Sequence, residues 1–246
     1  MKEGGGKEVI RLRNVSKHYP MGDSIVRALN HLEFKVFEGE FVAIMGPSGS
    51  GKSTAMNLVG SLDVPTKGTI YLDEHDISTL EESDLAQIRG QKIGFIFQSF
   101  NLIPNLTAKE NVMLPMMFQG TDVDARAEKA EELLELVELT DRMDHYPGEL
   151  SGGQRQRVAI ARSLANDPEV ILADEPTGNL DTKTGAIVME FLEKLNKEGK
   201  TIVMVTHDPD LAKAHADVVY WLLDGELDKV TKGSKTLYKN KAKGAK

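Results

Sequence analysis

The chain of 246 residues carries 30 Lys and Arg against 38 Asp and Glu, which gives a formal net charge of −8, and 40% of its residues are hydrophobic. This length suits one large core, and the acidic balance disfavours nucleic acid as a partner, because an acidic protein repels the phosphate backbone. The absence of cysteine excludes disulfides and thiolate metal sites. Because we find neither an N-terminal apolar signal segment nor a run of membrane-spanning length, we expect any membrane role to depend on another chain.

Eight apolar runs predict strands, and most of the later runs are separated by helix-like segments. They cover residues 9–12, 32–36, 41–45, 69–72, 93–97, 170–173, 201–205 and 218–222. The early runs, up to residue 36, have few helix signals and predict a small antiparallel layer. The unbroken apolar character of 170–173 and 202–205 predicts central parallel strands that are covered on both faces, as in an α/β fold.

A glycine-rich loop follows the predicted strand 41–45 and precedes a helix-compatible stretch. It reads Gly46-Pro47-Ser48-Gly49-Ser50-Gly51-Lys52-Ser53 and fits the pattern Gly-x-x-x-x-Gly-Lys-Ser/Thr. The glycines let backbone N–H groups turn toward a polyphosphate, Lys52 adds a positive charge, and the Ser53 hydroxyl is suited to ligate magnesium. A flexible Gly/Ser loop is the alternative, but the strand-loop-helix context favours a nucleotide-phosphate site.

The pattern becomes helical between residues 106 and 162. The stretch 125–139 has an apolar face, which predicts an inserted helical subdomain over roughly residues 99–162. That face consists of Ala127, Ala130, Leu133, Leu134 and Val137.

The segment Leu150-Ser151-Gly152-Gly153-Gln154 supports two interpretations that can both hold. Ser151 and Gln154 fit a capping box that opens a helix over 155–165. Gly152 and Gly153 expose backbone N–H groups at the same helix N-terminus, which makes a second anion site. Because the loop at 46–53 already cradles one polyphosphate, the second site is useful if it approaches a nucleotide on another copy, as in a symmetric dimer.

Two acids, Asp174 and Glu175, directly follow the predicted strand 170–173. Neighbouring side chains point to opposite faces of a strand, so the two carboxylates can have different tasks. Asp174 is suited to hold magnesium and Glu175 to polarise an attacking water. A solvated acidic turn would be the simpler interpretation of this pair alone, but the glycine-rich loop in the same predicted sheet favours the catalytic one.

Three motifs, in this order along the chain, resemble the ATP-binding cassette (ABC) family: Gly46 to Thr54, Leu150 to Gln154, and Asp174-Glu175. The resemblance covers nearly the whole chain. Segments 17–22, 60–68 and 93–104, the last followed by 110–112, are similar to the lipoprotein-release and macrolide-export group, with the bacterial cell-division cassette close by. The resemblance implies a P-loop NTPase with a RecA-like α/β core, an N-terminal antiparallel β layer and the inserted helical subdomain.

The predicted organisation is a single ATP-binding domain over residues 1–228 and a basic tail over 229–246. The tail carries seven lysines and no acid, which predicts a disordered, solubilising end. Attraction to anionic lipid headgroups is the alternative.

The resemblance also implies roles for single residues. Tyr19 would stack on adenine, Gln98 would sense magnesium and the attacking water, and His207 would contact the γ-phosphate. The residues that would act in trans on a nucleotide held by residues 46–54 are Ser151, Gly152, Gly153, Gln154 and Asp181. Magnesium would be held by Ser53, Gln98 and Asp174. Viewed alone, Tyr19 could be a packed aromatic and Gln98 a loop amide. Asp181 could be a helix cap, and His207 a loop residue beside the N-cap residue Asp208.

The implied function is hydrolysis of ATP, with Mg²⁺, by two paired copies that drive an integral-membrane permease from the cytoplasmic face of the membrane. The side chains of Phe100, Leu102 and Ile103 could fill a groove of that permease or pack within their own subdomain. One alternative is an ATP-dependent regulator of a cell-envelope or cell-division complex. A nucleic-acid ATPase is disfavoured by the acidic body and the single cassette.

Overall fold

The computed structural model describes residues 6–22 and 24–233, and the chain forms two compact units. The first unit comprises residues 1–85 and 199–246, and the second comprises residues 86–198. The chain passes from the first unit to the second within helix α2 (Glu82–Lys92) and returns after helix α6 (Thr182–Lys197).

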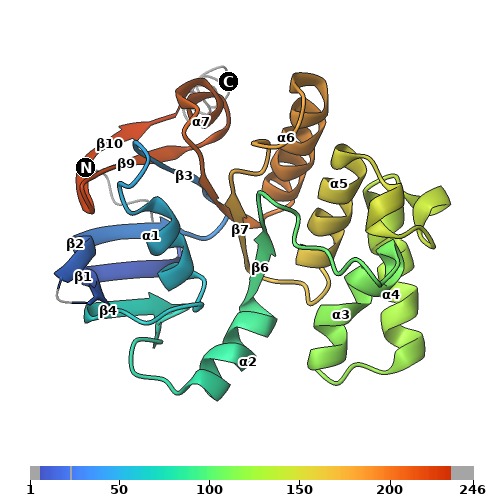
Figure 1. The fold of residues 1–246 in the computed structure, drawn as a ribbon, viewed down its shortest axis with the longest axis horizontal. Helices are drawn as coiled ribbons and strands as arrows, with labels where there is room; N and C mark the ends of the chain where they lie inside the picture. Colours follow the sequence, from blue (N-terminus) through green and yellow to red (C-terminus); the bar gives the residue numbers. More distant parts are fainter. Residues whose placement is uncertain (1–5, 23, 234–246) are drawn as a thin grey trace. The chain divides into compact units, whose positions relative to one another are not determined.

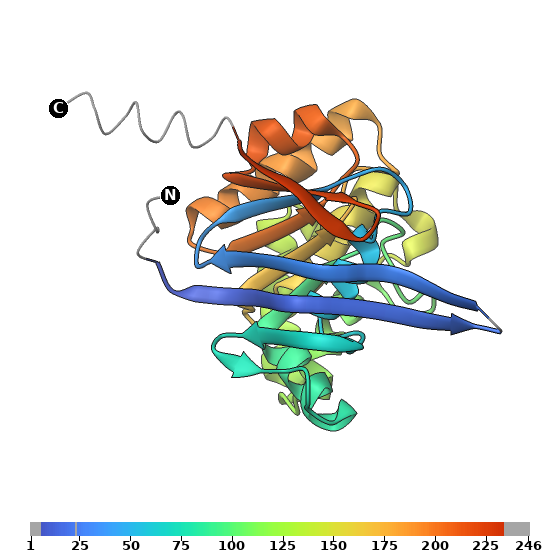
Figure 2. The ribbon, with the colours of Figure 1, turned by 90° about the vertical axis from the view of Figure 1, so that its left-hand side faces the viewer.

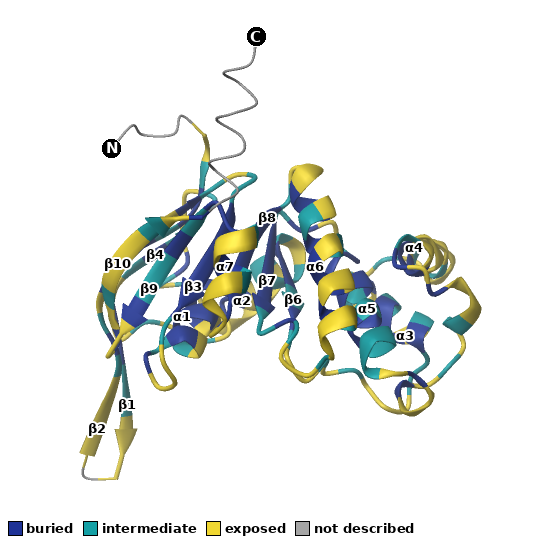
Figure 3. Ribbon diagram, turned by 90° about the horizontal axis from the view of Figure 1, so that it is seen from above, coloured by how far each residue is buried: buried dark blue, intermediate teal, exposed yellow. Residues whose placement is uncertain are grey.

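The first unit contains an antiparallel sheet with the strand order β2-β1-β4-β5. Strands β1 (Glu8–Met21) and β2 (Ser24–Phe37) form a long hairpin that continues past the end of β4 (Lys67–Leu72), as Figure 2 shows. Strand β5 (His75–Asp76) pairs with β4. The hairpin end is exposed (Figure 3), with Met21 and Ile25 at 63% and 67% exposure. The predicted antiparallel layer is confirmed.

The first unit also holds the strands that lead to the glycine-rich loop. Strand β3 (Phe41–Met45) lies parallel to and between β8 (Thr201–Val205) and β9 (Val218–Leu223). Every residue of β3 and β8 is buried, as their unbroken apolar runs predict. The ends of β3 and β8 lead to helices α1 (Lys52–Val59) and α7 (Pro209–His215). In such sheets ligands bind at the carboxyl ends of parallel strands, where the loop at 46–51 begins.

Strand β10 (Glu226–Lys232) pairs antiparallel with β9 and corrects the predicted start of the basic tail. The predicted start is residue 229, but Lys229 lies opposite Trp221 in the sheet, with its Nζ 4.9 Å from the indole ring centroid. The strand escaped prediction because most of its side chains are exposed and polar or charged. Residues 234–246 of the predicted tail lie outside the described residues.

The second unit pairs strand β6 (Ile93–Ile96) in parallel with β7 (Val170–Asp174). Helices α3 (Ala108–Phe118), α4 (Val123–Leu136) and α5 (Gly152–Ser163) pack together, and α5 also contacts β6 and α6 (Figure 1). Short 3₁₀ turns at Thr140–Arg142 and Pro147–Glu149 connect α4 to α5. The predicted apolar face of α4 is buried at Ala130, Leu133, Leu134 and Val137, whereas Ala127 is half-buried.

No helix within residues 6–22 and 24–233 is both long enough and apolar enough to span a bilayer.

Candidate functional site

The glycine-rich loop lies in the first unit and leads from β3 directly into α1. Gly51 is the N-cap residue of α1 and has a φ of 95°. Because glycine has no side chain, no side chain caps the N–H groups of the first turn. A β-carbon on Gly46 would lie 2.2 Å from the carbonyl oxygen of Leu222, and one on Gly51 would lie 2.5 Å from that of Ala28. Strands β9 and β2 therefore hold the loop so closely that only glycine fits at these two positions.

The ammonium group of Lys52 lies folded over this loop. Its Nζ donates hydrogen bonds to the carbonyl oxygens of Gly46 at 2.9 Å and Pro47 at 2.8 Å, and the residue is buried. The hydroxyl of Ser50 is buried and has no hydrogen-bond partner among the described residues. A buried cation, an unpartnered hydroxyl and an N-terminus without a side-chain cap are groups that a phosphate can satisfy. The residues present therefore fit a nucleotide phosphate.

Tyr19 is held in place through its hydroxyl group. The hydroxyl donates to Asp63 Oδ2 at 2.7 Å, and Lys17 Nζ donates to Asp63 Oδ1. The same Nζ lies 4.9 Å from the Tyr19 ring centroid. Burial and the neighbouring Asp63 raise the pKa of Tyr19, against the opposing effect of a hydrogen bond with Thr54. Tyr19 is thus oriented beside the start of α1.

The sequence patterns predicted no role for Asp63 or Lys17. Burial pushes the pKa of Asp63 upward, but hydrogen bonds from Lys17, Tyr19 and the Val64 N–H, with the charge of Lys17, outweigh it and lower that pKa. One signal was available for Lys17, because residues two apart in a strand share a face, which places it on the same side as Tyr19.

The second unit brings two predicted site residues together, Gln98 and Glu175. Glu175 directly follows β7 and has a φ of 44°, a left-handed conformation that costs a non-glycine residue about 1–3 kcal/mol. A β-carbon on Gly178 would lie 2.8 Å from Gln98 Nε2 and 3.3 Å from Glu175 Oε2. Both side chains therefore converge on Gly178. Asp174, the last residue of β7, is half-buried.

The predicted capping box at the start of α5 is confirmed. Ser151 is the N-cap residue, its Oγ accepts from the Gln154 N–H at 3.3 Å, and Gln154 Oε1 accepts from the Ser151 N–H at 2.8 Å. A β-carbon on Gly153 would lie 2.2 Å from Thr184 Cγ2 on α6, so the glycine is required for close helix packing. The first turn of α5 is therefore preformed, with its glycine amides at the helix end.

Asp181 caps α6, the helix against which α5 packs. Its carboxylate accepts from the Thr184 N–H at 3.0 Å and from the Thr184 hydroxyl at 2.6 Å, and these hydrogen bonds lower the pKa of Asp181. The simpler interpretation of Asp181 as a helix cap is confirmed, and its action across a dimer interface stays a prediction.

His207 lies in the first unit, between β8 and α7, and is exposed. The next residue, Asp208, caps α7 by accepting from the N–H groups of Asp210 and Leu211 at 2.9 and 3.1 Å. Ser53, in the first turn of α1, is also exposed.

Within the described residues no group of three or more His, Cys, Asp or Glu side chains could hold a metal ion. The predicted magnesium ligands Ser53, Gln98 and Asp174 offer a hydroxyl, an amide oxygen and a carboxylate, which are the oxygen donors that magnesium prefers.

Phe100 is half-buried and contacts its own unit, with its ring centroid 5.3 Å from Arg155 Cζ. Arg162 donates to the carbonyl oxygen of Phe100 at 2.8 Å, and burial lowers the pKa of this arginine. Leu102 is half-buried, whereas Ile103 is 42% exposed.

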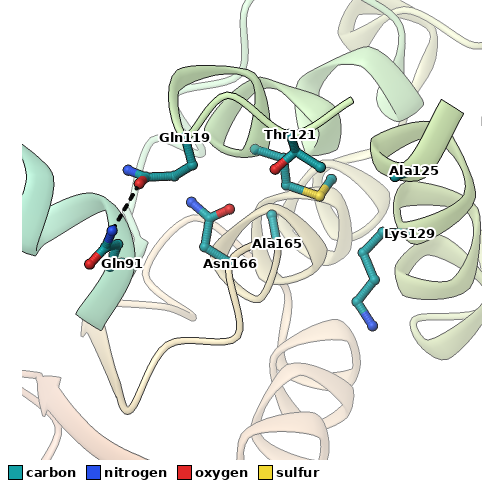
Figure 4. Close-up of a pocket in the computed structure, with 8 residues that line it drawn as sticks. Gln91, Gln119, Thr121, Ala125, Lys129, Ala165 and Asn166 are labelled. Atoms are coloured by element: carbon teal, nitrogen blue, oxygen red, sulfur yellow. Dashed lines mark hydrogen bonds between the residues drawn. The ribbon is translucent and has the colours of Figure 1, made fainter. Parts of the chain in front are cut away.

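A cavity of about 420 Å³ lies elsewhere in the second unit, among residues for which the sequence predicted no role. Figure 4 shows Gln91 facing Gln119, with Nε2 of Gln91 donating to Oε1 of Gln119 at 3.4 Å. The cavity is lined by Gln91, Met116, Gln119, Thr121, Ala125, Lys129, Ala165 and Asn166. Met117, Phe118 and Val123, on the adjoining ends of α3 and α4, are 45%, 75% and 56% exposed.

The fold and the glycine-rich loop define a P-loop NTPase, and comparison with known proteins identifies the family. Residues 29–178 match the family model described as ABC transporter. The chain is 53% identical over 222 residues to an ABC transporter ATP-binding protein of Thermotoga maritima, which covers 90% of this chain and 94% of that protein. It is 52% identical over 229 residues to the ABC transporter ATP-binding protein MJ0796 of Methanocaldococcus jannaschii, and this match covers 91% of this chain and 97% of that protein.

A dimeric structure of MJ0796, in a post-hydrolysis state bound to ADP and Pi, superposes with a TM-score of 0.84 at 50% identity and covers 91% of this chain and 98% of that one. The macrolide export ATP-binding/permease protein MacB 1/2 of Paracoccus denitrificans is 49% identical over 222 residues, which are 90% of this chain and 33% of that protein. The chain belongs to the ABC transporter family and is an ABC-type ATPase, as its motifs predicted.

Proposed function

We propose that two copies of this chain bind two ATP molecules between them and that hydrolysis drives a membrane permease. Residues 46–54 of one copy would hold each nucleotide, and residues 151–154 of the other would close on it. One observation carries this proposal: the chain presents two helix N-termini, α1 and α5, in which close packing requires glycine. Two structures of the relative MJ0796 are dimeric, one of them with ADP and Pi bound, which supports pairing of two copies.

Binding begins with the loop at 46–53. Lys52 exchanges its bonds to the carbonyl oxygens of Gly46 and Pro47 for the outer phosphates, while the first-turn N–H groups of α1 meet their negative charge. Ser53, Gln98 and Asp174 are the residues we propose to hold Mg²⁺, which when bound neutralises charge on the phosphates. Tyr19, fixed by Asp63, stacks on the adenine.

Hydrolysis converts ATP and water to ADP and phosphate. Glu175 polarises the water, and Gln98, whose side chain also converges on Gly178, orients the same water. His207 contacts the γ-phosphate. In the dimer, Asp181 acts across the interface together with Ser151, Gly152, Gly153 and Gln154. Once the γ-phosphate is cleaved, the bridge between the two helix N-termini is broken and the acidic copies separate.

The permease would meet the helical subdomain, residues 99–162, on the cytoplasmic face of the membrane. Exposed Met117, Phe118 and Val123, beside the cavity described above, offer apolar contact area on this subdomain, and Ile103 adds to it. The name of the MacB relative combines ATP-binding and permease in one protein. In this proposal the chain acts as one ATP-binding domain that includes β10, up to Lys232.

The dependence of ATP turnover on protein concentration tests the pairing. If two copies form the site, the rate per copy rises with concentration at low protein and then saturates, whereas a rate per copy independent of concentration contradicts the pairing.

Purification of the chain from detergent-solubilised membranes, with partners identified by mass, tests whether a permease is its partner. Recovery of a cell-envelope hydrolase complex that moves no solute would instead indicate the regulatory alternative.

A further inference from the structure

Gln156 lies one turn into α5 and is fully buried, at 0% exposure. Its Nε2 donates a hydrogen bond to the carbonyl oxygen of Pro176 at 2.7 Å. Because that oxygen can only accept, the nitrogen of the amide must face it. Pro176 is the residue after Glu175, so this bond reaches the backbone that carries the proposed catalytic carboxylate.

The other end of this amide shows that packing does not explain the residue. Gln156 Oε1 is buried and has no hydrogen-bond partner in the described part of the chain. An apolar side chain of similar size would fill the same volume without burying an unpartnered oxygen. The bond to Pro176 is therefore the interaction that distinguishes glutamine from an apolar residue here.

The loop that Gln156 reaches is strained at Glu175. Glu175 has a left-handed backbone, and its carbonyl oxygen accepts from the Gly178 N–H at 2.9 Å to close a turn. Leu180 N–H donates to Thr177 O at 3.1 Å in the same loop. These are local bonds, whereas Gln156 ties the loop to a different element, α5.

We propose that Gln156 is a positioning residue that holds Glu175 in its hydrolytic orientation and links it to the N-terminus of α5. The inference rests on the proposed function, in which Glu175 polarises water. In that function Gly152 and Gly153 act on the nucleotide of the partner, while Glu175 acts on the nucleotide of its own chain. Through Gln156, binding of the α5 N-terminus to the partner's nucleotide would determine the orientation of the Glu175 carboxylate at the nucleotide of its own chain.

The first test is Gln156→Leu, which removes the donor and keeps an apolar side chain of similar size. We expect the Kd for ATP to stay within about twofold of wild type and kcat to fall about 10- to 100-fold, as for displaced catalytic groups. The matched control is Ser163→Ala on the same helix, because the buried Ser163 hydroxyl bonds only within α5, to Ile160 O at 2.7 Å. The control should keep kcat. A wild-type kcat for Gln156→Leu overturns the inference.

The second test is the pH profile of Gln156→Glu. Burial raises the pKa of a carboxyl group, and only its protonated form can donate to Pro176 O. The turnover of this variant, relative to wild type, should therefore rise as the pH is lowered from about 8 to about 6. A ratio that is constant with pH overturns the inference. If Gln156→Leu does not fold, this profile decides the question.

The third test combines Gln156→Leu with Glu175→Gln. If Gln156 acts through Glu175, the double variant has the same residual turnover as Glu175→Gln alone. A further 10-fold loss would show a general structural effect and overturn the inference. The two proposals fail separately: wild-type turnover in Glu175→Gln contradicts the proposed function, whereas slow Glu175→Gln with fast Gln156→Leu contradicts only this inference.

Discussion

The side-chain amide of Asn179 donates a hydrogen bond to the backbone carbonyl oxygen of Gln98 at 2.9 Å. It ties the segment after β6 to the loop after β7 within the second unit. As a result, the side chains of Gln98 and Glu175 meet at Gly178, where no β-carbon fits without displacing Gln98. The side chains of Gln98 and Glu175, which we propose act on the attacking water, thus lie close together at one turn.

Substitution Gly178→Ala should slow ATP hydrolysis without weakening ATP binding. The added methyl group would lie 2.8 Å from Gln98 Nε2 and 3.3 Å from Glu175 Oε2, and it must push Gln98 away. We expect kcat to fall about 10- to 100-fold, measured by phosphate release, with the Kd from calorimetry unchanged. Gly148→Ala is the control, because a β-carbon there meets no described atom within 4 Å. Equal turnover in the two variants would contradict the proposed roles.

Substitution Glu175→Gln should trap a nucleotide-dependent dimer. The variant keeps the phosphate donors of the loop at 46–53 and loses the group that polarises water, so ATP binds and persists. Light scattering should show dimers with ATP and monomers with ADP. Monomers alone in saturating ATP would contradict the proposed pairing.

Substitution Lys52→Ala should weaken ATP binding itself. A charge-assisted hydrogen bond contributes about 1.5–3 kcal/mol, so the Kd should rise about 10- to 100-fold. Calorimetry measures this change, with Lys213→Ala as the control, since Lys213 is exposed on α7 in the same unit. Unchanged affinity in Lys52→Ala would contradict the role of this lysine.

Substitution Ser151→Arg should block pairing while each copy still binds ATP. The long cationic side chain would stand at the N-terminus of α5, where the partner's nucleotide is expected. The variant also loses the capping hydroxyl, and Ser151→Ala measures that loss separately, at about 1 kcal/mol of unfolding free energy. If Ser151→Arg abolished ATP binding by the monomer, the segment at 150–154 would act on its own chain's nucleotide.

Acid should destabilise the Lys17–Asp63 pair. The pKa of Asp63 is lowered in the folded state, so its contribution to stability is present above the unfolded pKa near 4 and is lost as the pH falls through the folded value. Urea unfolding should therefore show that Lys17→Met loses stability at neutral pH, and that its difference from wild type shrinks in acid. A difference that is independent of pH would contradict this account. Lys67→Met serves as the exposed control.

Sequence patterns predicted the buried strands best. The predicted bounds 41–45 and 201–205 coincide with β3 and β8, because both strands are buried along their whole length. Strands β1 and β2 extend well beyond the predicted runs 9–12 and 32–36. Residues 24–27 of β2 are all exposed, so no alternation of apolar and polar residues marks that part of the hairpin.

In the candidate site, the sequence predicted the local motifs but not the hydrogen bonds between distant residues. The loop at 46–53 and the capping box at Ser151 are local patterns within a few residues, and both were predicted. Three hydrogen bonds of the site join residues that are far apart in the sequence. The separation is 46 positions for Lys17 and Asp63, 20 for Gln156 and Pro176, and 81 for Asn179 and Gln98. No helix or strand period relates residues at such separations, so only the folded structure reveals these contacts.

The self-closed capping box at Ser151 and Gln154 has a kinetic consequence. Because this helix end is already rigid, little conformational entropy is lost when a second copy docks, and the encounter needs no prior ordering of that surface. Hydrolysis would then regulate how long the assembled pair persists rather than how quickly it forms, and the residence time of the complex becomes the quantity that the chemical step controls.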